Sequence, residues 1–368
     1  MDIRDRRLKA RLSKWSTCSV ETKRGLVKPR KVIMFKRFLS YYEPQMGLFV
    51  ADTVCALVLA AIDLAFPIIL RNLTGGLFTQ GQAAIMQALG MIAVGLVLMY
   101  AVRCACRYFV SYWGHVMGAR MESKMREDLF DQYERFSFAY FDRNSSGDMM
   151  SRVVNDLFDI CEAAHHVPEW IIICGIEIIG SFVILFTIAP VLALAMAVVT
   201  AAFAVIMFWQ NMRMREVFSD NRKKISGINA QLQDSLAGMR VVKSFANEET
   251  ERFKFRASNN RYLSSKENMY HAMGVYTATY GLLSGVLYVI VVLLGGWLVA
   301  QGQLQAVDMA TFALYISLFC TPLETLVNSA ETYQKAIAGF KRMDEVLSTA
   351  PDIQDKPGAT DLQVTAGA

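Results

Sequence analysis

Long uncharged stretches alternate with polar ones along this chain. Several approach or exceed the roughly 20 apolar residues that a helix needs to cross a bilayer, and the longest, 170–210, carries a single charge, Glu177. That stretch is too long for one span, and Pro190 divides it because proline cannot continue a helix interior without losing a hydrogen bond. The pattern predicts an all-α membrane protein with six transmembrane helices, at 46–70, 84–110, 167–188, 190–211, 271–300 and 307–330.

Composition and charge agree with this pattern and orient it. A hydrophobic content of 54% and a mean hydropathy of +0.29 exclude an ordinary soluble protein. Of the 38 lysines and arginines, 35 lie in the first 45 residues, in segments 113–165 and 211–270, or after residue 330, all on one side of the predicted membrane. The positive-inside rule places this side, with both termini, in the cytoplasm. The net charge of +5 then reflects topology and anionic lipid, and no nucleic-acid partner is expected.

The residues that flank the spans fall into three segments. Residues 1–30 form a basic tail without a cleavable signal peptide. Residues 31–45 mix cations with large apolar side chains, as an interfacial elbow helix does, and Pro44 separates them from the first span. Residues 348–368 are expected to be a linker that follows the membrane domain, 46–347.

The cysteines and histidines do not predict a metal site or a disulfide. All seven cysteines lie in predicted spans or on the cytoplasmic side, where disulfides are rare. Cys104 and Cys106 are two residues apart on a helix and point to different faces. His165 and His166 are adjacent, so they too are expected to point in different directions, and no shared metal is expected there.

The two long cytoplasmic segments have a helical pattern that continues the spans. Apolar residues recur at spacings of three and four with charges between them. At 1.5 Å per residue, a helix through 112–136 would extend about 37 Å beyond the bilayer, and 211–232 and 247–270 would extend the fourth and fifth spans in the same way. Each pair of extensions meets at a polar tip, 136–156 or 231–249. On spacing alone, the first tip is a plain helical hairpin, with Ser145 or Ser146 capping the returning helix.

The tips carry two ordered sets of residues that resemble the intracellular loops of type I (type IV fold) ABC exporters. The first set is Tyr140, Phe141, Asp142, Gly147, Asp148, Met149, Met150, Ser151, Arg152, Asn155 and Asp156. The second set is Asp234, Gly238, Met239, Val241, Val242, Lys243, Ser244, Phe245 and Glu248. One departure is Asp234, which stands where the family usually has glutamate. The resemblance covers roughly residues 31–357 and implies a bacterial multidrug or lipid exporter-like half-transporter in the inner membrane.

The resemblance also implies partners. Each tip would hold a short coupling helix that docks on a nucleotide-binding ATPase domain, and the second would dock on the partner subunit's domain. The protein would be a domain-swapped homodimer or heterodimer in the lipid bilayer. Phe141 and Phe245 would fill clefts in the partner domains.

No ATPase motif occurs in the 368 residues, since the sequence contains no G-x(4)-G-K-[ST] phosphate-binding loop. No catalytic residue is therefore assigned to this chain, and ATP and Mg²⁺ are expected in a separate nucleotide-binding domain. That domain would follow residue 368 in the same polypeptide, which is the favoured interpretation, or belong to another chain.

Charged and aromatic residues within the spans are candidates for the substrate pathway. Charged groups in a span usually face water or the interior of the bundle. For the charged candidates, the alternative is an internal ion pair, for example between Glu177 and an arginine. For the aromatic candidates, it is ordinary packing. The candidates are Asp63, Arg103, Arg107, Glu177, Tyr276, Tyr280, Tyr315 and Phe319.

Two other functions remain open at this point. An ion-coupled secondary transporter would need carboxylates or broken helices near the bilayer midplane, and Asp63 and Glu177 allow it. The long cytoplasmic helices argue against it. A membrane regulatory subunit that transports nothing is the other alternative.

Overall fold

The computed structural model describes residues 30–354 and 358–360. The predicted basic tail, apart from Arg30, and residues 355–357 and 361–368 of the predicted linker lie outside the described residues. The chain divides into two compact units, Met1–Tyr41 and Tyr42–Ala368. In the part of the first unit that is described, the only long element is helix α2, Arg30–Ser40, which begins at the last residue of the predicted tail and ends inside the predicted elbow.

The second unit contains the six predicted membrane spans. Within the described part of the chain, six helices are long and apolar enough to cross a bilayer, as the sequence pattern predicts. The bounds of the elements that form them are η1 Glu43–Gln45, α3 Met46–Gly75, η2 Leu77–Thr79, α4 Gln82–Phe109, η3 Val110–Gly114, α5 His115–Glu134, α8 Leu157–Ile188, α9 Pro190–Ala237, α11 Glu248–Ile290, η5 Val291–Gly295, α12 Gly296–Ala300 and α13 Ala306–Ser348.

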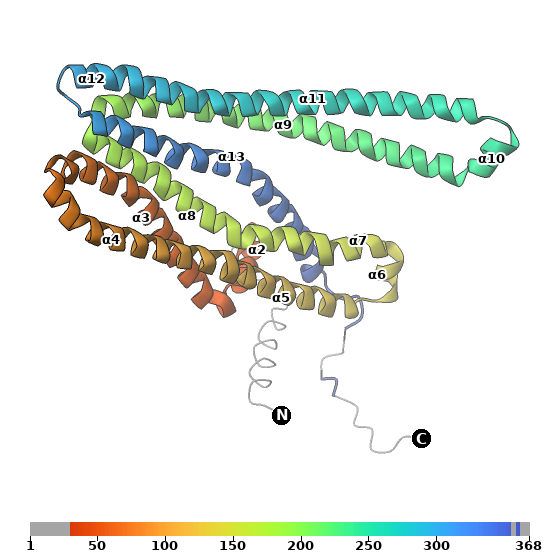
Figure 1. Cartoon of the computed structure of the whole chain (residues 1–368). Coiled ribbons are helices and arrows are strands. Elements are labelled where there is room, and N and C mark those ends of the chain that lie inside the picture. Colours follow the sequence, from red (N-terminus) through yellow and green to blue (C-terminus); the bar gives the residue numbers. More distant parts are fainter. Residues whose placement is uncertain (1–29, 355–357, 361–368) are drawn as a thin grey trace, which may run out of the picture. The chain divides into compact units, whose positions relative to one another are not determined.

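The helices extend well past the predicted spans, as the polar periodicity indicates. The second span continues from α4 through the π-helical turn η3 into α5, and α9 and α11 continue to the second tip (Figure 1). The short connections α3–α4, α8–α9 and α12–α13 lie at one end of this unit, and both tips lie toward the other end. This arrangement agrees with short loops on one side of the membrane and long ones on the other.

Helix α8 is the centre of one group of helices, and α9 pairs with α11. α8 packs against α3, α5 and α13, while α9 and α11 pack along each other and diverge from α5 and α8 toward the tips (Figure 1). The α3–α8 approach depends on a glycine: a Cβ at Gly180 would lie 2.4 Å from Leu64 Cδ1. Small residues of this kind allow transmembrane helices to come close together.

The proline in α8 creates a local defect that another residue repairs. Pro168 has no N–H, so the carbonyl of Ala164 loses its donor within the helix. The buried Tyr42 hydroxyl donates a hydrogen bond to that carbonyl at 2.5 Å.

We expect Tyr42→Phe to lower the free energy of unfolding by about 1 kcal/mol, because the Ala164 carbonyl would be left buried without a partner. Unfolding of the purified protein in mixed micelles would measure this. Ser40→Ala, which removes only the exposed hydroxyl that donates to the Arg37 carbonyl, is the control and should leave stability within about 0.5 kcal/mol. Equal stability of the wild type and Tyr42→Phe would show that the bond contributes nothing.

Candidate functional site

The first tip consists of two six-residue helices, α6 Phe138–Arg143 and α7 Ser146–Ser151, joined by an extended turn. The Asn144 side-chain amide donates to the Tyr140 carbonyl at 2.8 Å and so closes α6. The Ser145 hydroxyl accepts the Gly147 N–H at 3.3 Å and so caps α7. Of the two serines that the sequence offers as a cap, Ser145 is the one that acts.

The first tip is anchored on one side and apolar on the other. The rings of Phe136 and Tyr140 stack with centroids 4.0 Å apart, and both pack near the buried Tyr133. On the outer side, Phe138 is 89% exposed and Phe141 is 41% exposed. Rigid, exposed aromatic side chains of this kind are suited to insertion into a partner's cleft.

Most polar candidates of the first tip lie on its surface, and only Asp156 is buried. Asp148 and Arg152 form an ion pair at 2.8 Å, and the Asn155 amide donates to the Ser151 hydroxyl at 3.2 Å. Asp142 and Gly147 are exposed. These residues therefore form the polar surface of the first tip.

Asp156 differs from the other candidates of the first tip because its side chain is buried. It lies at the end of η4 (Arg152–Asp156) and accepts two hydrogen bonds from the Arg342 guanidinium of α13, at 2.6 and 2.5 Å. The pairing with Asp156 raises the pKa of Arg342, although burial opposes this. A Cβ at Gly339 would lie 3.2 Å from the Asp156 carbonyl oxygen, so α13 crosses η4 closely. Asp156 thus fastens the base of the tip to the last helix.

The second tip is the short helix α10, Met239–Ser244, between α9 and α11. α9 ends at Ala237, and the N–H of the next residue, Gly238, donates to the Asp234 carbonyl at 2.9 Å. Beyond α10, Ala246 adopts a left-handed conformation with φ of 50°, which turns the chain into α11. The Asn247 N–H donates to the Val242 carbonyl at 3.0 Å. These bonds hold α10 at the end of the hairpin.

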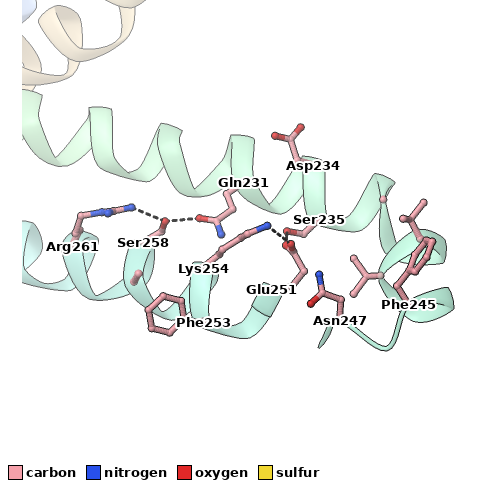
Figure 2. Close-up of a pocket in the computed structure, with 14 residues that line it drawn as sticks. Gln231, Asp234, Ser235, Phe245, Asn247, Glu251, Phe253, Lys254, Ser258 and Arg261 are labelled. Atoms are coloured by element: carbon pink, nitrogen blue, oxygen red, sulfur yellow. Dashed lines mark hydrogen bonds and ion pairs between the residues drawn. The ribbon is translucent and has the colours of Figure 1, made fainter. Parts of the chain in front are cut away.

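A cavity of about 920 Å³ opens between α9, α10 and α11 at this tip (Figure 2). One wall is polar: Glu251 accepts from Ser235 at 2.7 Å and pairs with Lys254 at 2.7 Å. The bonds to Lys254 and Ser235 lower the pKa of Glu251. Phe245 and Phe253 line the same cavity and are 79% and 75% exposed.

Charges beside α10 further fix the second tip. Lys243, at the end of α10, forms an ion pair of 3.1 Å with Glu248 at the start of α11. A hydrogen bond from the backbone, followed by the bond from Lys243, lowers the pKa of Glu248. Because this ion pair joins the end of α10 to the start of α11, it stabilises the turn between the two helices.

The charged candidates within the spans form one cluster. The Asp63 carboxylate accepts two hydrogen bonds from Arg103, at 2.7 and 3.3 Å. Glu177, on α8, is in electrostatic contact with Asp63, Arg103 and Arg107. The arginine–carboxylate bonds thus go to Asp63 rather than to the predicted partner, Glu177. Contact of this cluster with a substrate stays a prediction.

The aromatic candidates are mostly packed in the core. Tyr315 and Phe319 are fully buried; the Tyr315 hydroxyl donates to the Leu64 carbonyl at 2.5 Å, and Phe319 packs against Phe182 with centroids 4.8 Å apart. Tyr276 is buried and hydrogen-bonded to Asn328 at 3.3 Å. Only Tyr280 keeps partly exposed surface in this conformation, so the other three have packing roles here and their contact with a substrate stays a prediction.

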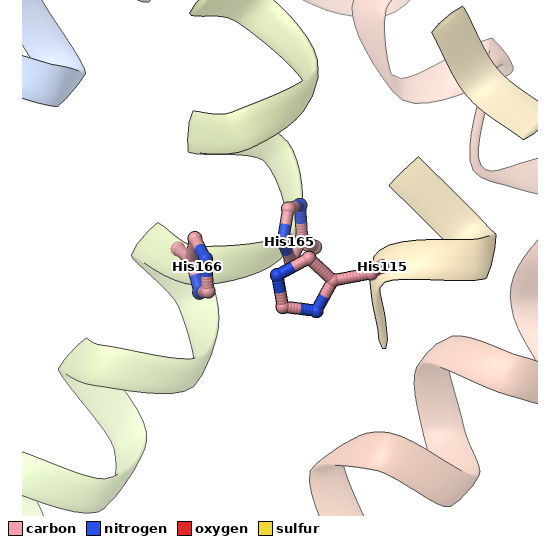
Figure 3. Close-up of side chains that lie close together, drawn as sticks. All are labelled: His115, His165 and His166. Atoms are coloured by element: carbon pink, nitrogen blue, oxygen red, sulfur yellow. The ribbon is translucent and has the colours of Figure 1, made fainter. Parts of the chain in front are cut away.

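The expectation that His165 and His166 point apart is wrong. Their ring centroids lie 4.0 Å apart, and the ring of His115 lies 4.6 Å from His165 and 5.1 Å from His166 (Figure 3). Adjacent helical residues are separated by about 100° around the axis, so two long side chains can still converge on a third that lies between their directions. The place of His115 in this cluster and the pairing of Arg342 with Asp156 were not predicted, because their partners are distant in sequence.

The comparisons with known proteins agree with the arrangement of spans and tips. The sequence profile of the ABC transporter transmembrane region matches residues 49–323. The uncharacterized ABC transporter ATP-binding protein YwjA of Bacillus subtilis (strain 168) is 32% identical over 334 residues, covering 91% of this chain and 58% of YwjA. An ATP-dependent lipid A-core flippase of Syntrophus aciditrophicus (strain SB) is 24% identical over 340 residues, covering 90% of this chain and 55% of the flippase.

A third relative carries a different name. The putative multidrug export ATP-binding/permease protein YgaD of Bacillus subtilis (strain 168) is 22% identical over 331 residues, covering 89% of this chain and 57% of YgaD. The chain thus spans little more than half the length of the curated relatives it matches.

Proposed function

Because the chain belongs to the family of ABC transporter transmembrane regions, we propose that it forms half of the translocation pathway of an ATP-driven exporter. In this proposal, ATP-binding domains bind and hydrolyse ATP with Mg²⁺, and the two tips pass the resulting movement to the membrane helices. We keep the domain boundaries that the sequence predicts, with an elbow at 31–45, the membrane domain at 46–347 and a linker at 348–368.

The observation that carries this proposal is the placement of exposed aromatic residues on short helices at the ends of long ones. Phe138 begins α6 and is 89% exposed, and Phe245 directly follows α10 and is 79% exposed. Burial of such a side chain in a partner is worth roughly 1.5–3 kcal/mol. Long helices that leave the bilayer, such as α9 and α11, can move as rigid bodies, so a movement of the docked partner reaches the membrane.

The partners follow from the same features. The ATP-binding domains belong to the same polypeptide or to a separate chain. The names of the relatives YwjA and YgaD include the words ATP-binding, which favours the same polypeptide. A second membrane half, identical or different, would cover apolar surface on the cytoplasmic parts of α9 and α11, where Leu232 is 37% exposed and Leu263 is 51% exposed. The positive charge on the tip side favours both termini in the cytoplasm of a bacterial cell, with the protein in its inner membrane.

We expect the 368-residue chain by itself to hydrolyse no ATP, since its sequence has no phosphate-binding loop. Together with its ATP-binding domains, in inside-out vesicles, it should accumulate a fluorescent amphiphile when ATP is added. Vanadate should stop this accumulation, and a protonophore should not. Accumulation that a protonophore stops and vanadate spares would identify a secondary transporter, and lack of transport with any energy source would favour a regulatory subunit.

A further inference from the structure

Three of the four histidines of the chain gather where α5 begins beside α8. One ring nitrogen each from His115, His165 and His166 lies within 4.8 Å of the other two. His115 directly follows the π-helical turn η3, and turns of this kind are frequent at functional sites. None of the tip contacts or proposed partners involves these residues.

The hydrogen bonds of two of the rings fix which nitrogen is available. His115 Nδ1 lies 2.6 Å from the Ser111 carbonyl oxygen, and His165 Nδ1 lies 2.8 Å from the Cys161 carbonyl oxygen. A carbonyl oxygen can only accept, so both Nδ1 atoms carry the proton. In the neutral rings, each Nε2 therefore presents a lone pair. Histidines that bind metals almost always donate their other N–H in this way.

The third ring is held differently. His166 stacks on Trp170, with centroids 4.9 Å apart and planes 5° apart. Its Nε2 lies 3.7 Å from Glu162 and its Nδ1 lies 3.5 Å from Glu169. If one ring nitrogen of His166 binds an ion, the other nitrogen faces a carboxylate that can orient the ring.

Buried polar atoms at this place have no hydrogen-bond partner. His165 Nε2, His166 Nδ1 and Asp52 Oδ1 are buried in this way, and His165 as a whole is 4% exposed. An unsatisfied buried polar atom in a folded protein calls for an explanation such as a bound ion or water. Asp52 lies beside the site. A Cβ built on Gly114, the residue before His115, would be 3.3 Å from Asp52 Oδ1.

We infer that His115, His165 and His166 form a binding site for a borderline divalent transition metal, with Zn²⁺ as the representative ion. Imidazole nitrogens bind this class of ion well. Tetrahedral bonds of about 2.0–2.1 Å place nitrogens roughly 3.3 Å apart, so the rings need to close by about 1.5 Å. His115 is exposed and has room to move, and its exposure also gives the ion access. Asp52, Glu162 and Glu169 supply negative charge around the site, and the ion would tie α5 to α8.

The test uses the protein at its full length, purified with a tag free of histidine, stripped with EDTA and dialysed against Zn²⁺. The double variant His115→Ala/His166→Ala should bind one Zn²⁺ fewer per chain than the wild type. His115→Ala alone should weaken binding at this site by at least about 10-fold. The matched control is His271→Ala, which removes the only other histidine of the chain and should change neither value.

Two further measurements keep the inference testable if a variant fails to fold. Co²⁺ bound to the wild type should give visible d–d bands of a four-coordinate site without the charge-transfer band of a thiolate ligand, which separates the histidines from Cys161. Zn²⁺ should raise the melting temperature of the wild type more than that of His115→Ala. Equal Zn²⁺ stoichiometry in the wild type and the double variant, a thiolate band, or an equal effect of His271→Ala would overturn the inference.

Discussion

Replacing Phe245 by alanine is expected to reduce ATP-driven transport by about 30-fold or more while the protein remains folded. The side chain is 79% exposed within this chain, so truncation should change its stability by no more than about 0.5 kcal/mol. If the ring fills a cleft in an ATP-binding domain, as we propose, its loss costs at least about 2 kcal/mol at that interface. That energy corresponds to the expected fold-change, because 1.4 kcal/mol is a factor of about ten.

The measurement compares transport and ATP hydrolysis in the same vesicles. Phe245→Ala should lose transport and substrate-stimulated hydrolysis, and keep a basal rate. Phe141→Ala at the first tip should act in the same direction but less strongly, since Phe141 is only 41% exposed. Phe208→Ala is the matched control: Phe208 is 57% exposed in the predicted span of α9, far along that helix from α10. Unchanged transport and hydrolysis in both tip variants would refute their role in docking.

Breaking the Asp156–Arg342 pair is expected to cause the largest loss of stability, and the loss should depend on which partner is removed. Asp156→Ala leaves a guanidinium whose side chain is 44% exposed and stays solvated, so the cost is about 2 kcal/mol. Arg342→Ala leaves a carboxylate that is only 9% exposed without its partner, and the cost should rise to about 3 kcal/mol. Unfolding in mixed micelles would measure both.

The first tip supplies a control for this pair. Asp148→Ala breaks the Asp148–Arg152 ion pair, in which Asp148 is 52% exposed. Exposed pairs contribute little, so the loss should be below about 1 kcal/mol. A double-mutant cycle on Asp156 and Arg342 should give a clear interaction energy. Equal effects of all three single variants would mean that burial of the carboxylate does not decide the cost.

The helices could be predicted from the sequence because their signals are local. The uncharged stretches, the break before Pro190 and the Ser145 cap each depend on residues within a few positions of one another. The same is true of the long extensions, in which apolar residues recur at spacings of three and four. The family resemblance likewise depended on short ordered motifs at the tips.

The side-chain pairings could not be predicted, because they depend on how distant helices pack. The partner of Asp63 is Arg103, 40 residues away, and the partner of Asp156 is Arg342, 186 residues away. His115 meets His165 only because α5 lies beside α8. Periodicity shows which face of a helix is polar, but not which residue of another helix it meets.

The π-helical turn η3 has a consequence for every side chain between the membrane and the first tip. A π-turn adds about one residue to the helical repeat, and one residue corresponds to about 100° of rotation. The apolar stripe of α4 and that of α5 are therefore out of phase, although the axis runs on from one helix to the other. His115 is the first residue after this change of phase. Buried and exposed positions in α5 cannot be found by counting in steps of 3.6 from α4, and a one-residue deletion that turned η3 into an α-helical turn would leave His115 facing α8.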